Sequence, residues 1–340
     1  MKIYKYRKYR RLLFFSVVLL LMAATVQGKV GTIDKKRNHS PERKATLAIQ
    51  PPSQDITFSR ASAGSKYKDV FIMTSGGAVT RVTFGDLVFP KYDSANADWS
   101  PNGDWLVFDS TRDNIATGTS DLYKVQISNL GNVTRLTYLP DSWEPSWSKV
   151  NDKILFGSNR PTALGTYTFY TMDPGGSNQL PLFPIPPPIN TYGSRWSFDG
   201  TKIVFSQFVP GPPARYQIAI AVAPNYTPVT ITSGFIDRNP AFSPDGTKIL
   251  FSRLDPNSTD TNKIELYKVD ATPGATPSPL TSTAFGIQSD QAHWFGTKIV
   301  FVSNRNWNNF QIYEMNEDGT GVVPITNDSA FDHSSPVYKR

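Results

Sequence analysis

Cysteine is absent from this 340-residue chain, and histidine occurs only three times. No disulfide can form, so packing alone must stabilise the folded state. Histidine is also the commonest metal ligand, and neither His293 nor His333 belongs to a regular ligand spacing. We therefore predict no metal and no cofactor.

Local signatures of catalysis are missing as well. The chain contains no Gly-x-Ser-x-Gly elbow, no His-Glu-x-x-His pair and no phosphate-binding glycine loop. The common hydrolase, metalloprotease and nucleotide-binding motifs are thereby excluded, and any function must reside in less regular features.

Basic charge is scarce outside the N-terminus, although the formal net charge is +7. Residues 1–44 hold 12 of the 35 basic residues and two of the 28 acidic ones, which leaves 23 basic against 26 acidic residues in the remainder. Nucleic-acid binding needs clustered Lys and Arg on the folded domain. We therefore expect no nucleic-acid partner.

The N-terminus has the layout of an export signal. A basic stretch ends at Arg11, an apolar run covers 12–26, and cleavage after Gly28 would suit the small residues there. We predict a signal peptide over 1–28, a disordered tether over 29–52 and a folded domain over 53–340. The alternative is an uncleaved anchor, which would be the chain's sole contact with a membrane. Either way, we expect a periplasmic or extracellular location.

A phenylalanine recurs at intervals of 46 to 50 residues, each time in a short apolar strand. The six positions are Phe58, Phe108, Phe156, Phe205, Phe251 and Phe301. A period of this size with several strands per unit is typical of a β-propeller. Continuous apolar runs indicate strands that are buried on both faces.

Each repeat is predicted to hold four strands. A Trp-Ser or similar strand comes first and a Pro-Asp-Gly-type turn joins it to the phenylalanine strand, as at Ser243 to Gly246. An aromatic third strand and a weak fourth strand follow. Proline in the fourth strand, as over 181–188, fits an edge position.

The two ends of the domain complement each other. The first repeat lacks its Trp-Ser strand, whereas residues 332–340 match 141–149 in register and stand alone. We predict an all-β, six-bladed propeller of four-stranded blades, in which this C-terminal strand joins the N-terminal blade and closes the ring.

These repeats resemble the WD-like repeat of the TolB-type propellers. The motif is clearest over 240–251 and 298–315, and the resemblance covers about residues 54–340. It implies a propeller without the N-terminal α/β domain of TolB, since the tether is too short to hold one. It also implies that the first strand of each blade lines the central channel.

A ring of polar side chains at one channel mouth follows from that resemblance. The predicted binding residues precede the aromatic of each first strand: Asp93, Asp141, Asn190, Asp237, Asp290, Asp332 and, beside the last, His333. They could bind a cation or a basic partner segment. Alternatively, they are turn residues that bond backbone amides.

Other repeated residues have both functional and structural interpretations. The Arg of Ser-x-Arg (Arg112, Arg160 and Arg305) could contact a ligand or form an ion pair with a neighbouring turn. Trp99, Trp147, Trp196 and Trp294 could stack sugars or fill the core. Loops 113–119, 159–166, 208–215 and 254–262 share one face and could form a binding surface.

The function that we predict is that of an exported, non-catalytic propeller, monomeric and TolB-like, that binds a protein or cell-envelope ligand as a scaffold. The alternative is a lyase or glycoside hydrolase that uses channel carboxylates such as Asp93, Asp141 and Asp332.

Overall fold

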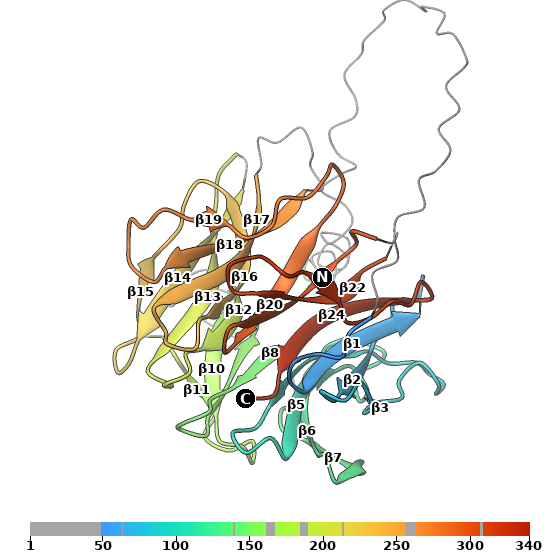
Figure 1. Ribbon diagram of the computed structural model, residues 1–340. Helices are drawn as coiled ribbons and strands as arrows, with labels where there is room; N and C mark the ends of the chain where they lie inside the picture. Colours follow the sequence, from blue (N-terminus) through green and yellow to red (C-terminus); the bar gives the residue numbers. More distant parts are fainter. Residues whose placement is uncertain are drawn as a thin grey trace, which may run out of the picture. The chain divides into compact units, whose positions relative to one another are not determined.

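The computed structural model describes residues 49–340, apart from 63, 139, 161–166, 184–189, 213, 256–262 and 307–308. The predicted signal peptide and the tether up to residue 48 lie outside this range. No helix occurs among the described residues, so none there could span a membrane. The described chain is built from β-strands and their connections (Figure 1).

The strands fall into four sets by their position in the sheets. The inner strands are β4 (Ser94–Trp99), β8 (Ser142–Trp147), β12 (Thr191–Trp196), β16 (Ile236–Phe242), β20 (Ser289–Phe295) and β24 (Phe331–Tyr338). The second strands, which carry the repeated phenylalanine, are β1 (Ile56–Ser62), β5 (Trp105–Ser110), β9 (Ile154–Ser158), β13 (Lys202–Val209), β17 (Lys248–Leu254) and β21 (Lys298–Ser303). The third strands are β2 (Asp69–Met73), β6 (Asp121–Gln126), β10 (Thr168–Met172), β14 (Arg215–Val222), β18 (Ile264–Asp270) and β22 (Gln311–Asn316). The outer strands are β3 (Val79–Arg81), β7 (Asn129–Arg135), β11 (Leu180–Pro181), β15 (Thr227–Thr230), β19 (Ser278–Pro279) and β23 (Val323–Pro324).

Within the described range, four separate sheets have four antiparallel strands each. A fifth sheet has eight strands, because one parallel pair, Tyr216 with Ile236, joins β14 to β16. The six-bladed count therefore stays a prediction. In its favour, each inner strand lies beside the next, from β4 through β8, β12, β16 and β20 to β24 and back to β4.

The C-terminal strand pairs with the first strand of the domain. β24 runs antiparallel to β1, with Ser59 opposite Ser334 and Ser62 opposite Phe331, and the two lie side by side in Figure 1. The predicted completion of the N-terminal sheet is confirmed. The last strand thus supplies the inner strand of the first sheet and leaves β1 with no open edge.

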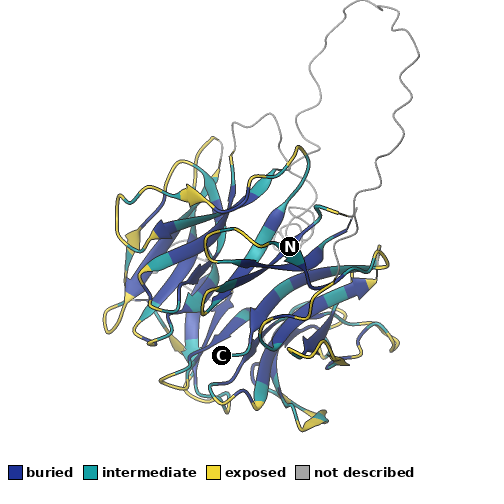
Figure 2. Cartoon of the chain, viewed as in Figure 1, coloured by how far each residue is buried: buried dark blue, intermediate teal, exposed yellow. Residues whose placement is uncertain are grey.

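The core lies between neighbouring sheets. The six repeated phenylalanines are buried, and so are Trp99, Trp147, Trp196 and Trp294, which confirms the packing interpretation of the tryptophans. Figure 2 shows buried strands and exposed connections. Burial of each large side chain contributes about 1.5–3 kcal/mol, which compensates for the lack of disulfides.

Candidate functional site

Three of the predicted site residues bond the backbone of the neighbouring sheet. Asp93, Asp141 and Asp332 each accept a hydrogen bond from an amide just before a third strand. The donors are the amides of Lys68 (2.8 Å), Ser120 (2.6 Å) and Phe310 (3.0 Å), respectively. This is the amide-bonding role of a turn residue, and it ties one sheet to the next.

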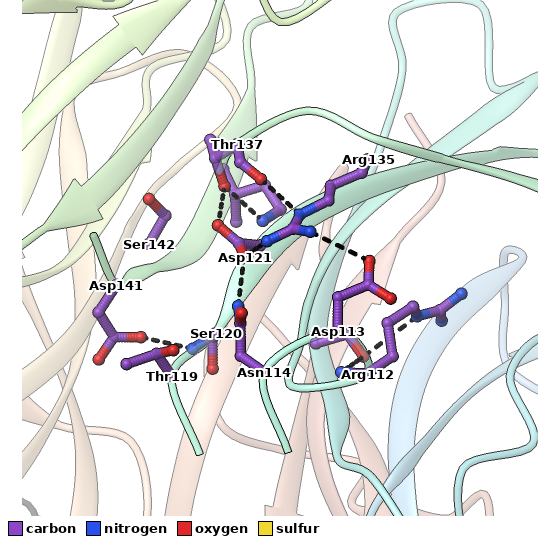
Figure 3. Close-up of polar contacts among 12 residues, drawn as sticks. Arg112, Asp113, Asn114, Thr119, Ser120, Asp121, Arg135, Thr137, Asp141 and Ser142 are labelled. Carbon is purple, nitrogen blue, oxygen red and sulfur yellow. Dashed lines mark hydrogen bonds and ion pairs between the residues drawn. The ribbon is translucent and has the colours of Figure 1, made fainter. Parts of the chain in front are cut away.

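Figure 3 shows the surroundings of Asp141. Next to Ser120 lies the buried Asp121, which accepts from Arg135 Nη2 (2.6 Å) and Thr137 Oγ1 (2.9 Å). The same arrangement recurs in the first sheet with Asp69, Arg81 and Thr83. Because this network repeats from sheet to sheet, it is architectural rather than part of a single site.

The remaining predicted residues have separate partners. Asp237 is buried in a two-bond ion pair with Arg253 (2.7 and 2.8 Å). Asp290 Oδ1 accepts from Asn239 Nδ2 (2.8 Å). The carbonyl of Asn190 accepts from the amide of Phe208 (3.1 Å).

His333 is buried against the ring of Phe58, with ring centroids 5.6 Å apart. Its Nδ1 lies 3.3 Å from the carbonyl oxygen of Phe310. Burial lowers the pKa of His333 to about 4, and the nearby Arg60 charge acts in the same direction. The imidazole is therefore neutral at physiological pH.

The predicted site residues are thus spread over several sheets, each with its own partner. Among the described residues, no group of three or more His, Asp or Glu side chains is placed to hold a metal ion. Their proposed binding role remains a prediction. Of the predicted loops, 113–119 is described in full, whereas 161–166, 213 and 256–262 within the other three lie outside the described residues.

The repeated Ser-x-Arg arginines share a structural contact, but with aromatic rings rather than with a turn carboxylate. Arg112, Arg160 and Arg305 do not form the expected pair with a turn carboxylate among the described residues. Each guanidinium lies about 5 Å from the ring centres of the repeated phenylalanine and of the facing tyrosine in the third strand. Cation–π contact replaces the ion pair because the aromatic pair presents its faces there. Arg253, a variant of this motif, does form an ion pair, with Asp237.

A bulge in every inner strand was missed from the sequence. The residue three positions before the terminal aromatic has a positive φ between 51° and 65°: Asn96, Glu144, Gly193, Asn239, Gln291 and Ser335. Three hydrogen bonds join neighbouring members of this set. Ser335 Oγ donates to Asn96 Oδ1 (2.8 Å), the Ser335 amide to Gln291 Oε1 (2.7 Å), and the Gly193 amide to Glu144 Oε2 (3.0 Å). Asn and Gly tolerate this backbone region, which was the available signal.

Asp109 bonds two of these bulge residues, Asn96 and Glu144, and has no carboxylate counterpart in the other sheets. The equivalent residues of the second strands are Ser59, Gly157, Ser206, Ser252 and Val302. Asp109 Oδ2 accepts from Asn96 Nδ2 and from the Glu144 amide, both at 2.9 Å. Burial raises the pKa of Asp109 to about 7, and the Glu144 and Asp93 charges act in the same direction.

Charged residues gather where the inner strands end. We call Asp98, Lys149, Arg195, His293 and Arg340 the axial charged cluster. They come from β4, β12, β20 and the residues that follow β8 and β24. Lys149 Nζ lies 3.5 Å from Asp98 Oδ1, and Arg340 Nη2 lies 2.7 Å from His293 Nε2.

Burial lowers the pKa values of Lys149, Arg340 and His293 in this cluster. It lowers the pKa of Lys149 to about 8 and that of Arg340 to about 10, and it holds the pKa of His293 well below its usual value. Burial alone would raise the pKa of Asp98, but the charges of Lys149, Arg195 and Arg340 lower it below its ordinary value. The side chains of the cluster are therefore one carboxylate, three cations and a neutral imidazole near pH 7.

A ring of antiparallel sheets whose inner strands surround a common axis defines a β-propeller. A family model described as the TolB beta propeller domain matches residues 89–294, more than half of the sequence. The chain belongs to this family.

Solved structures support the fold. TolB from Acinetobacter baumannii matches with a TM-score of 0.66 and 17% identity, over 84% of this chain and 66% of that protein. A putative TolB from Agrobacterium tumefaciens matches with a TM-score of 0.59 and 15% identity, over 85% of this chain and all of that one. An oligogalacturonate lyase solved with manganese matches with a TM-score of 0.51 and 15% identity, over 82% and 74% of the two chains. At these identities, the likeness concerns the fold alone.

One curated relative also matches in sequence. It is an uncharacterized protein, Atu1656, from Agrobacterium fabrum strain C58, and it is 29% identical over 152 residues. The match covers 42% of this chain and 48% of that protein, so it spans about half of the relative's length.

Proposed function

We propose that this chain is exported and acts as a non-catalytic propeller that binds a protein or a cell-envelope ligand. The observation that carries the proposal is the use of the predicted carboxylates. Asp93, Asp141 and Asp332 hold backbone amides of neighbouring sheets, so they act as structural acceptors rather than as a catalytic acid and base. A rigid ring with variable connections is suited to presenting a binding surface.

Export is tested with residues 1–52 fused to alkaline phosphatase, which is active only outside the cytoplasm. The expected result is phosphatase activity that disappears when Leu19 and Leu20 in the apolar run are both replaced by Arg. Inactive enzyme with the native leader would overturn the export proposal.

Binding is tested by capture from an envelope extract with the tagged full chain, followed by a titration of the captured ligand. The expected result is a saturable complex that the untagged chain displaces. A chain that retains nothing displaceable, while it turns over an added substrate, would overturn the scaffold proposal.

The enzymatic alternative is supported by one observation, the Asp109 carboxyl group. Its pKa of about 7 would let it donate a proton near neutral pH. Glu144, whose amide donates to Asp109 Oδ2, would supply a second carboxyl group. Oligogalacturonides and neutral glycosides are the substrates to assay, by absorbance of the unsaturated product and by reducing ends. Turnover that Asp109→Asn abolishes would establish this alternative, whereas turnover at the buffer rate would eliminate it.

A further inference from the structure

The axial charged cluster has more cationic than anionic side chains, and none of its five side chains is fully exposed. Asp98 is buried, and the Lys149 side chain is 11% exposed. Both carboxylate oxygens of Asp98 already accept hydrogen bonds from the backbone. Oδ1 accepts from the Trp99 amide (2.8 Å) and Oδ2 from the Trp147 amide (2.8 Å). One side-chain carboxylate thus faces three cationic side chains that are only partly exposed to water, and uncompensated charge away from water is costly.

The two arginines lack a carboxylate partner of their own. Arg195 Nη1 donates to the carbonyl oxygen of Pro145 at 3.3 Å. The guanidinium carbon of Arg340 lies 3.8 Å from the ring centre of Phe198, and its Nε is buried with no hydrogen-bond partner among the described residues. Neither arginine forms an ion pair with another described residue, so both retain donors that can bind an acceptor.

Two hydrogen-bond donors face the two ring nitrogens of His293. The amide of Tyr338 points to His293 Nδ1 at 3.4 Å, and Arg340 Nη2 lies 2.7 Å from His293 Nε2. A neutral imidazole has one acceptor nitrogen and one N–H. The ring therefore cannot accept from both donors, and the cluster lacks one acceptor.

The cations are not part of the repeated architecture. Lys149 and Arg340 stand two positions after the terminal aromatic, where the other inner strands have Pro101, Phe198, Pro244 and Gly296. Arg195 stands one position before the aromatic, where the others have Asp98, Ser146, Ala241, His293 and Val337. The Asp121 network, by contrast, recurs in the first sheet with Asp69 and Arg81.

We propose that Lys149, Arg195 and Arg340 form an oxyanion-binding site at the end of the axis where the inner strands finish. The ligand group is a carboxylate or a phosphate, since both present oxygens to guanidinium donors and match the planar fork of arginine. The bound oxyanion supplies the missing acceptor and neutralises the excess charge. This site goes beyond the proposed function, because it binds a small anion whether or not the chain has a macromolecular partner.

The test is calorimetric titration of the full chain with inorganic phosphate and, separately, with citrate, at constant ionic strength maintained with sodium chloride. Saturable binding of either anion is expected. Tighter binding of phosphate assigns a phosphate ligand, and tighter binding of citrate assigns a carboxylate. No saturable binding of either would overturn the proposal.

Variants locate the site. Arg340→Gln and Arg195→Gln should each weaken binding about tenfold or more, because each removes charged donors from the anion. The matched control is Lys248→Gln, which removes one exposed cation paired with Asp270 at 2.7 Å and should leave the affinity unchanged. Equal weakening by all three variants would show a general charge effect and would overturn the site. If one arginine variant fails to fold, the other provides the same test.

Discussion

Replacement of Asp109 by Asn should change how stability depends on pH. The folded state holds the Asp109 proton up to a pKa of about 7, against an ordinary value of 3.8. The folded state therefore binds a proton that the unfolded chain releases, and stability is full below about pH 3.8 and is lost as pH rises towards 7. A shift of this size corresponds to about 4 kcal/mol, as an order of magnitude. The Asp109→Asn variant has no such loss, and the side-chain oxygen of its amide can still accept from Asn96 and from the Glu144 amide.

Urea unfolding at pH 4 and pH 8, followed by tryptophan fluorescence, measures this difference. The wild type should lose about 4 kcal/mol more than the variant between the two pH values. The comparison of the two proteins cancels the contributions of all other titrating groups. Asp104→Asn, which removes an exposed carboxylate near the same strand, should follow the wild type. Identical pH slopes for wild type and Asp109→Asn would refute the reasoning.

Two further substitutions test contacts between paired strands of one sheet, since Trp143 is the partner of Gly157 and Arg253 that of Asp237. Gly157→Ala should cost about 1–3 kcal/mol in urea unfolding, because a Cβ there would lie 2.6 Å from Trp143 Nε1; Gly131→Ala, whose Cβ meets a single side-chain oxygen at 3.7 Å, is the control, and equal costs would contradict the contact. Asp237→Ala should cost about 3–5 kcal/mol in the same assay, since it leaves the Arg253 guanidinium buried without its partner. A loss below about 1 kcal/mol would show that the pair does not stabilise the fold.

The repeated elements could be predicted because each has its own local signal. The phenylalanine strands show as apolar runs at a constant period, and the C-terminal strand at Tyr338 shows as an unpaired copy of the one that ends at Trp147. The outer strands were harder to predict. Their pairing is short, and in the first sheet β3 stops at Arg81 because the next residues bond differently: Thr83 Oγ1 accepts from the Val70 amide at 3.0 Å.

The features at the axis could not be predicted, because they depend on ring closure. Asp98 and Arg340 are far apart in sequence, and only the ring of inner strands brings them into one cluster. The carboxylates predicted from the sequence recur at a constant position for an architectural reason. Each of Asp93, Asp141 and Asp332 accepts a hydrogen bond from an amide of the neighbouring sheet. Asp109 and Lys149, whose pKa values are shifted, differ in residue type from the equivalent positions of the other repeats. Such a departure from the repeat is the signal that could have identified them.

Ring closure by β24 is the central claim, and a cysteine pair tests it directly. The chain has no native cysteine, and Ser62 and Phe331 are paired residues of β1 and β24, at a distance that suits a disulfide. Ser62→Cys with Phe331→Cys should form an intramolecular disulfide in the folded protein and raise the melting temperature relative to its reduced form. Ser62→Cys with Ala330→Cys, which is one residue out of register, should form it much less readily. A folded, monomeric Ser62/Phe331 variant whose two thiols both remain free under oxidising conditions would contradict the closure.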